Sequence, residues 1–146
     1  MGSPKTPSSA SPFTSQSPSF ADFINLIIAK GPGCYLYEKD LKRTYRQIPV
    51  DPKDYRFLGY CGKNLFYFDT VLPCGLRSAT LACQRTMNAI SYIFRSAYHH
   101  ECVNYIDDFG CAEASHLDAF LAFQDLEDLF SRLALESSPA KDCRPS

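Results

Sequence analysis

Hydrophobic residues recur at steps of three and four in three segments of the chain, which is the spacing of one face of an α-helix. The first predicted helix follows Ser19, which forms a capping box with Asp22, and it ends at Gly31. The second, of about twenty residues, follows the segment LPCGL, and Ser115 and Asp118 cap the third. The residues at helical spacing are Phe20, Phe23, Ile24, Ile27 and Ile28 in the first helix and Ala79, Cys83, Met87, Ile90, Phe94 and Ala97 in the amphipathic second helix. In the third helix, the stripe expected to be buried is Leu117, Phe120, Phe123, Leu126, Phe130 and Leu133.

Short apolar runs bounded by turn residues predict β-strands between these helices. The first strand is CYLYEKDL (34–41), and two hairpins are expected: YRFLGY (55–60) with LFYFDTVL (65–72), joined by the turn CGKN, and ECVNYI (101–106) with FGCAE (109–113). The order helix, strand, hairpin, helix, hairpin, helix is typical of an α+β fold in which helices pack on one face of an antiparallel sheet.

The length of 146 residues suits one domain, and a hydrophobic content of 45% is enough for a core. The first nineteen residues are rich in Ser and Pro, so residues 1–19 are predicted to be a disordered tail and 20–146 the folded domain. The seven cysteines form no C-x-x-C pair, which argues against a zinc ribbon or a disulfide framework. With no apolar run long enough to span a membrane and no signal peptide, we expect an intracellular protein of the cytoplasm, the nucleus or both.

Charge is unevenly distributed along the chain. Residues 39–63 hold seven of the fifteen basic residues, whereas residues 101–136 hold nine acidic residues and one arginine. This polarity indicates an anionic partner for one part of the protein and a cation-binding site in another.

The segment VNYIDDFG (103–110) places two adjacent carboxylates inside an otherwise apolar run. Ionised side chains are costly to bury unless something pairs with them, so Asp107 and Asp108 form either an ordinary exposed turn or a cation site. Asp40 ends the first strand, and all three carboxylates would meet if that strand lies beside the second hairpin. An all-oxygen site of this kind favours Mg²⁺.

Three motifs resemble those of reverse transcriptases of retrotransposons and retroviruses, in the family's order. YIDD resembles the Y-x-D-D turn, KDLKRTYRQIPV is similar to D-L-K-x-A-Y-x-Q-I-P, and LPCGLRSATLACQRTM is similar to L-P-x-G-L-x-x-A-x-x-x-x-Q-R-x-M. The resemblance covers roughly residues 20–146, and the segments GPGCYLYEKDL and LALESSPAK are most similar to retroelements of the DIRS type, which encode a tyrosine recombinase. It implies a polymerase palm with a ferredoxin/RRM-like sheet, lacking most of the fingers and thumb.

The resemblance implies two-metal transfer of dNTPs onto a primer 3′-hydroxyl by an RNA-directed DNA polymerase. Asp40 and Asp107 would bind two Mg²⁺ ions, for which Mn²⁺ could substitute, and Asp108 would complete the acidic turn. The backbone carbonyl of Leu41 would add a ligand. Lys141 would protonate the departing pyrophosphate.

Further residues are assigned to the incoming nucleotide by the same resemblance. The ring of Tyr45 would lie against the sugar and exclude a 2′-hydroxyl, and the backbone amides of Arg43 and Thr44 would face the triphosphate. Cys74 and Gly75 would contact the nucleotide and template. Cys74 departs from the Gln, Phe or Met that the family more often carries.

Arg77 and Gln84, expected on the second helix, and Tyr105 are assigned to the template and primer. The implied partners are an RNA or DNA template, a DNA primer, dNTPs, and the fingers, thumb and RNase H segments of a parent polyprotein, with no membrane. The alternative is a catalytically silent, retroelement-derived fragment that acts as a nucleic-acid or protein binding module.

Overall fold

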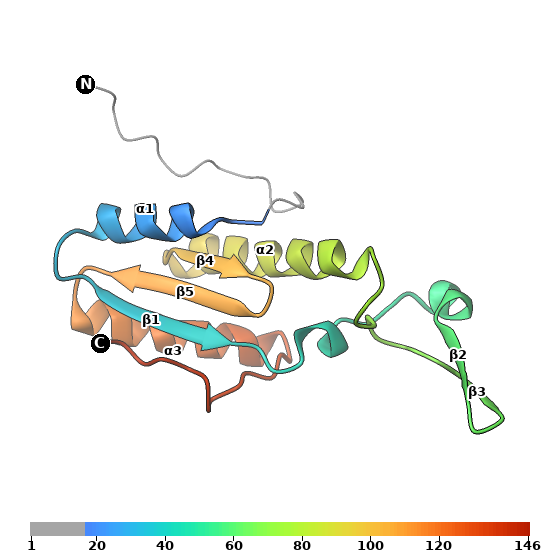
Figure 1. Cartoon of the computed structure of the whole chain (residues 1–146). Helices are drawn as coiled ribbons and strands as arrows, with labels where there is room; N and C mark the ends of the chain where they lie inside the picture. The colour runs from blue at the N-terminus through green and yellow to red at the C-terminus, as the bar shows by residue number, and fades with distance from the viewer. Residues whose placement is uncertain (1–16) are drawn as a thin grey trace.

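The computed structural model describes residues 17–146 (Figure 1). Most of the expected disordered tail therefore lies outside the described residues, and residues 17–19 lead into the first helix. The predicted order of helices and strands is confirmed, with two short 3-10 helices added. The elements are α1 (Phe20–Lys30), β1 (Tyr35–Asp40), η1 (Thr44–Gln47), η2 (Pro52–Phe57), β2 (Gly59–Gly62), β3 (Leu65–Phe68), α2 (Ala79–Tyr98), β4 (Cys102–Tyr105), β5 (Asp108–Glu113) and α3 (His116–Arg132). Within the described part of the chain, no helix is long and apolar enough to cross a membrane.

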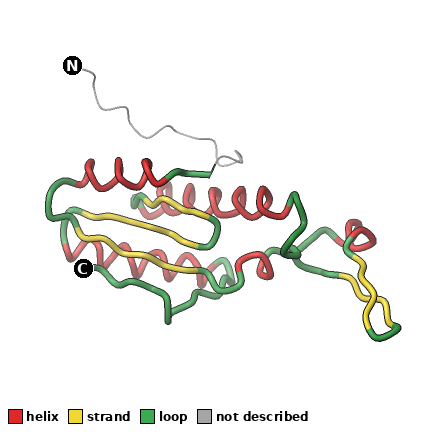
Figure 2. Tube along the Cα trace, in the orientation of Figure 1, coloured by secondary structure: helices red, strands yellow, loops and turns green. Residues whose placement is uncertain are grey.

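The main sheet has three antiparallel strands in the order β1-β5-β4 (Figure 2). The strand β5 lies in the middle and pairs with β1 from Tyr35 opposite Glu113 to Asp40 opposite Asp108. The hairpin of β4 and β5 is closed by the pair Tyr105 and Asp108. This register brings the end of β1 to the turn of the YIDD segment.

Helices cover both faces of the main sheet. Phe109 packs edge-on against Phe130 of α3, with ring centroids 5.2 Å apart, and its cross-strand neighbour Asn104 is hydrogen-bonded to α2. The next residue, Gly110, points to the opposite face, where a Cβ would lie 3.1 Å from the ring of Phe23 in α1. Thus α2 and α3 share one face as expected, and α1 lies across the other.

The core lies between the sheet and the two longer helices. It comprises Tyr37, Leu41, Leu72, Ala79, Cys83, Met87, Ile90, Phe94, Phe109, Cys111, Ala119, Ala122, Phe123, Leu126, Leu129 and Phe130. The predicted stripe of α2 is confirmed except at Ala97, which is exposed. In α3 the expected burial of Leu117, Phe120 and Leu133 is wrong, because the helix turns its alanines toward the sheet, where small side chains allow close packing.

The helix α1 begins and ends as predicted, with the Ser19 and Asp22 capping box and a C-cap at Gly31. Its apolar face is only partly covered: Leu26 is buried, whereas Phe20, Ile24 and Ile28 are exposed. The helix packs mainly on β4 and β5, which leaves these three side chains uncovered.

The first hairpin extends away from the main sheet (Figure 1). Its strands are shorter than predicted, because Tyr55, Arg56 and Phe57 belong to η2 rather than to a strand. Lys63 and Asn64 form the turn with φ values of 50° and 61°, as a type I′ hairpin requires. Phe66 at the tip is 86% exposed.

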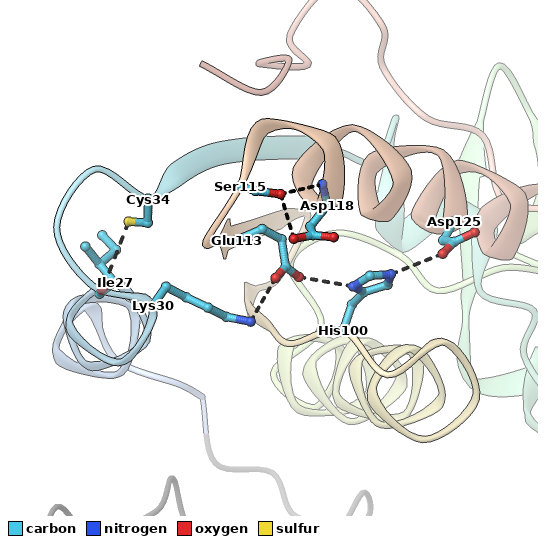
Figure 3. Close-up of polar contacts among 8 residues, drawn as sticks. All are labelled: Ile27, Lys30, Cys34, His100, Glu113, Ser115, Asp118 and Asp125. Atoms are coloured by element: carbon cyan, nitrogen blue, oxygen red, sulfur yellow. Dashed lines mark hydrogen bonds and ion pairs between the residues drawn. The ribbon is translucent and has the colours of Figure 1, made fainter.

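A polar cluster joins four segments at the end of β5 that lies away from the YIDD turn (Figure 3). Nζ of Lys30 in α1 lies 2.9 Å from Oε2 of Glu113 in β5. Nδ1 of His100 lies 3.1 Å from Oε1 of Glu113, and Nε2 of His100 lies 3.1 Å from Oδ2 of Asp125 in α3. Both His100 nitrogens therefore face carboxylates. The cluster ties α1 and α3 to the sheet, and the Ser115 cap lies beside it.

Candidate active site

Three carboxylates meet where β1 ends and β5 begins. Asp40 is the last residue of β1, Asp108 is the first of β5, and the two are directly paired. Asp107 lies in the turn before β5. One carboxylate oxygen from each residue lies within 4.8 Å of the others, and Asp40 is buried. The predicted meeting of these side chains is confirmed; Asp108 begins the strand instead of lying within the turn.

The turn that carries Asp107 is held from two sides. Ile106 has a φ of 51°, which is unusual for a β-branched residue and costs about 1–3 kcal/mol. Its backbone N–H donates to Oε1 of Gln84 in α2 at 3.1 Å, and the carbonyl of Asp107 accepts from the backbone N–H of Leu41 at 2.9 Å. These two hydrogen bonds fix the turn against α2 and against the end of β1.

Proximity of the carboxylates perturbs their electrostatics. Burial, a hydrogen bond with Asp40 and the charge of Asp107 raise the pKa of Asp108 to about 6. The ammonium of Lys141 lies beside this group, with its Nζ 3.4 Å from Oδ2 of Asp40. A hard divalent cation fits this group, because its donors are carboxylate oxygens and because the cation would relieve the repulsion among them.

A cleft of about 400 Å³ opens beside the carboxylates. This volume lies within the range typical of small-molecule sites. Four of its lining side chains are cationic and two are acidic, which suits an anionic ligand bound through a cation. The lining residues are Asp40, Leu41, Lys42, Arg43, Thr44, Tyr45, Arg46, Cys74, Ile106, Asp107, Ser138 and Lys141.

The residues predicted to contact the nucleotide largely line this cleft. Arg43 has a left-handed backbone with φ 50°, which turns the chain from β1 into η1. The Thr44 hydroxyl is buried and donates to the carbonyl of Leu41 at 3.1 Å. Tyr45 is half-buried, and its hydroxyl donates to Oγ1 of Thr80 at 3.3 Å. This bond fixes the ring at the edge of the cleft.

The segment LPCGL reaches the cleft through Cys74. Cys74 lines the cleft and is exposed, and Gly75 has a φ of 93°, a conformation that favours glycine. Arg77 lies in the turn before α2, so its predicted place on the helix is wrong.

Gln84 and Tyr105 differ in their surroundings. Gln84 lies on α2 as predicted but is buried, with its amide donating to Asn88 at 2.8 Å. Both ends of its amide are used inside the protein, and its assignment to the template remains a prediction. Tyr105 is exposed on the α1 side of the sheet, beside Asp108.

A buried ion pair between Lys39 and Asp142, which was not predicted from the sequence, lies next to Asp40. Lys39 is fully buried, with its Nζ 2.8 Å from Oδ2 of Asp142 and 4.1 Å from the ring centroid of Phe123. The other oxygen of Asp142 accepts the backbone N–H of Asp40 at 3.2 Å. The signal was available in the alternation of YLYEKD, which places Lys39 on the same face as the core residue Tyr37.

The C-terminal segment, residues 136–146, runs antiparallel along the free edge of β1. Backbone hydrogen bonds join Glu38 with Cys143 in both directions, and Leu36 with Ser146 in both directions. Together with Asp142, these bonds bring Lys141 to the carboxylates. Lys141 therefore donates a hydrogen bond to Asp40 although the two residues are 101 positions apart in the chain.

Comparison of the sequence with known proteins identifies its family. Residues 5–143 match the family described as reverse transcriptase (RNA-dependent DNA polymerase). The chain is 30% identical over 106 residues to the retrovirus-related Pol polyprotein from transposon 297 of Drosophila melanogaster, covering 70% of this chain and 10% of that protein.

Two solved structures share the fold. A foamy viral protease-reverse transcriptase in complex with an RNA/DNA hybrid has a TM-score of 0.71 at 12% identity, covering 89% of this chain and 17% of that one. The native protease-reverse transcriptase of prototype foamy virus has a TM-score of 0.65 at 15% identity, covering 75% and 14%. The chain spans a small part of the length of these relatives, and it belongs to the reverse transcriptase family.

Proposed function

We propose that the chain is the catalytic palm of a retroelement RNA-directed DNA polymerase, which adds dNTPs to a primer 3′-hydroxyl. The observation that carries the proposal is the meeting of Asp40, Asp107 and Asp108 beside a cleft with four cationic side chains. Such a pairing of carboxylates and cations suits a metal-bound triphosphate. The family and the similar fold support the same reaction.

Each side chain has a role that follows from its position. Asp40 and Asp107 would hold two divalent ions, Mg²⁺ or in its place Mn²⁺, with Asp108 completing the acidic group. When bound, the ions would activate the primer hydroxyl and neutralise charge that develops on the phosphates. Lys141 would give a proton to the departing pyrophosphate, and the position of its ammonium at the cleft beside Asp40 supports this role.

The cleft also provides a basis for choosing the nucleotide. Arg43 and Arg46 line it on the side of η1, where their charges would attract the triphosphate. The ring of Tyr45 would lie against the sugar and exclude a 2′-hydroxyl. An RNA or DNA template and a DNA primer would complete the complex, together with fingers, thumb and RNase H segments of a parent polyprotein.

Primer extension with dNTPs and Mg²⁺ on an RNA template tests the proposal. The chain should extend the primer, and Asp107→Asn should reduce extension by about a hundredfold or more, because loss of a metal ligand removes several kcal/mol of transition-state stabilisation. Asp54→Asn, an exposed carboxylate of η2, serves as the matched control. Extension that survives Asp107→Asn would place the activity elsewhere and contradict the proposal.

One surface favours a second function, a binding module without catalysis. The β2–β3 hairpin exposes Leu65, Phe66 and Phe68, and η2 exposes Phe57. A folded chain that binds a primer–template in a titration but does not extend it would support this alternative.

The kind of element and the cellular location complete the proposal. The segments GPGCYLYEKDL and LALESSPAK favour a DIRS-type element. A tyrosine recombinase encoded by the same element would support that subtype, and an integrase would contradict it. We place the activity inside the cell, in the cytoplasm, the nucleus or both, which imaging of the tagged protein tests.

A further inference from the structure

Cys102 and Cys111 are directly opposite each other on the strands β4 and β5. The hairpin has a two-residue turn and is closed by the pair Tyr105 and Asp108, which in such hairpins is a hydrogen-bonded pair. Pairs alternate along antiparallel strands, so three positions further Cys102 and Cys111 form a non-hydrogen-bonded pair.

This type of pair has the geometry that a disulfide needs. Opposed residues in a non-hydrogen-bonded pair have Cα atoms about 4.5 Å apart, and disulfides span Cα separations of about 4.4–6.8 Å. The side chains of such a pair also lie on the same face of the sheet and approach each other closely. Both residues are free thiols in this structure.

The surroundings give the two thiols different roles. The Cys102 Sγ lies 3.4 Å from the Ser91 hydroxyl, and a hydrogen bond from Cys111 lowers the pKa of the Cys102 thiol. Burial raises the pKa of Cys111. Cys102 is partly exposed, whereas Cys111 is fully buried. Of the two thiols, Cys102 therefore loses its proton more readily and is the one that reacts with an oxidant from solvent. Cys111 is the buried, protonated thiol that reacts with it in the second step.

We propose that Cys102 and Cys111 form an oxidation site for hydrogen peroxide, at which a cross-strand disulfide is made. The Cys102 thiolate attacks one peroxide oxygen, which breaks the O–O bond, releases hydroxide and leaves a sulfenic acid. The sulfur of Cys111 then attacks the sulfenic sulfur; the S–S bond forms, the S–O bond breaks, and the hydroxyl leaves as water with the Cys111 proton. In sum, two thiols lose two electrons to peroxide, and two waters form.

The site is distinct from the carboxylate cluster, with which it shares the strand β5. The turn between β4 and β5 carries Asp107, and Asp108 is the first residue of β5. A covalent bond between the strands restricts their relative movement behind this turn. The inference does not depend on polymerase activity.

Mapping of cross-links in the unmodified full chain tests the proposal. The reduced protein is treated with hydrogen peroxide, quenched with N-ethylmaleimide and analysed by mass spectrometry before and after proteolysis. Compared with the reduced and alkylated chain, the oxidised chain should carry two fewer N-ethylmaleimide adducts and should also lack two hydrogens. Proteolysis should release a linked peptide pair containing Cys102 and Cys111. At a constant peroxide concentration, the rate should not change when the protein is diluted tenfold, because the bond is intramolecular.

Three variants sharpen the result. Cys102→Ser and Cys111→Ser should both lose the linked pair, while Cys83→Ser, which removes another buried thiol on α2, should retain it. Oxidation that links other cysteines instead, or that gives sulfinic and sulfonic acids in the unmodified chain without a link between Cys102 and Cys111, would overturn the proposal.

Discussion

Asp40 and Asp108 face each other as directly paired residues on adjacent antiparallel strands, with Asp107 beside them. Like charges directly opposite each other destabilise such a pair, and here they also raise the pKa of Asp108. The arrangement costs stability in the absence of a cation and gains from one that binds. The site therefore has physical consequences that can be measured without an assay of polymerisation.

The stability of the metal-free protein should depend on the titration of Asp108. Its pKa is raised from 3.8 to about 6 in the folded state, so its contribution to stability is fully present below pH 3.8 and is lost as the pH rises through about 6. Solvent screening of this partly exposed group limits the effect to about 1 kcal/mol. Urea unfolding across this window should show a loss for the natural chain that Asp108→Asn lacks. Equal pH dependence in the two proteins would contradict the prediction.

Divalent cations should stabilise the protein through the same carboxylates. With Mn²⁺ at a hundredfold excess over its dissociation constant, linkage adds about 2.7 kcal/mol to the free energy of unfolding. Thermal unfolding should show this gain for the natural chain and for the Asp54→Asn control, but not for Asp40→Asn or Asp107→Asn, which each remove a charged oxygen donor. Equal stabilisation of all four proteins would mean that the ion binds elsewhere.

Tyr45 should control the choice between dNTPs and rNTPs. Replacing its ring by a smaller side chain in Tyr45→Val should raise incorporation of rNTPs relative to dNTPs by at least about tenfold, equivalent to about 1.4 kcal/mol. Tyr45→Phe keeps the ring and loses only the hydrogen bond to Thr80, so its selectivity should be unchanged. Single-nucleotide incorporation measures both ratios, and a similar effect of the two changes would argue against a steric role.

Local signals in the sequence were sufficient for most of the elements and for the carboxylate cluster. The capping box of Ser19 and Asp22 and the helical spacing from Ala79 to Phe94 depend on neighbours within one or two turns, so the sequence alone contains them. The meeting of Asp40 with Asp107 required only that β1 pair with the second hairpin.

Features that depend on the packing of distant segments were not predictable in the same way. The buried face of α3 is set by which side approaches the sheet, and the alternation of large and small residues allowed a wrong choice that included Phe120. The place of α1 on the opposite face is decided by Gly110, where the ring of Phe23 needs the space that a side chain would fill. The pairing of Lys39 with Asp142 joins residues 103 positions apart.

Gln84 should stabilise the YIDD turn from inside the protein. Gln84→Leu removes the acceptor of the Ile106 N–H and leaves this partly buried donor without its partner, at a cost of about 1 kcal/mol. We expect lower stability in urea and faster hydrogen exchange at the amide of Ile106. Gln124→Leu, which changes an exposed glutamine of α3, is the matched control and should leave both measurements unchanged. Unaltered exchange at Ile106 in Gln84→Leu would contradict this role.

The buried pair of Lys39 and Asp142 should hold the C-terminal segment on β1. Asp142→Ala leaves the ammonium of Lys39 with the more distant and exposed carboxylate of Glu127 at 3.7 Å, which should cost about 3 kcal/mol, and it removes the acceptor of the Asp40 N–H. Hydrogen exchange at Cys143 and Ser146 should become faster, because their bonds to β1 depend on the position of this segment.

A double variant separates the charge of Lys39 from the packing around it. Lys39→Met with Asp142→Leu removes both charges and fills the same space, so it should recover most of the stability lost in Asp142→Ala. The exposed pair of Lys53 and Asp51 is the comparison, because Lys53→Met should change stability by about 1 kcal/mol or less. If the double variant is as unstable as Asp142→Ala, the loss comes from the missing acceptor of the Asp40 N–H, and the loss of the Asp142 charge beside Lys39 is not its cause.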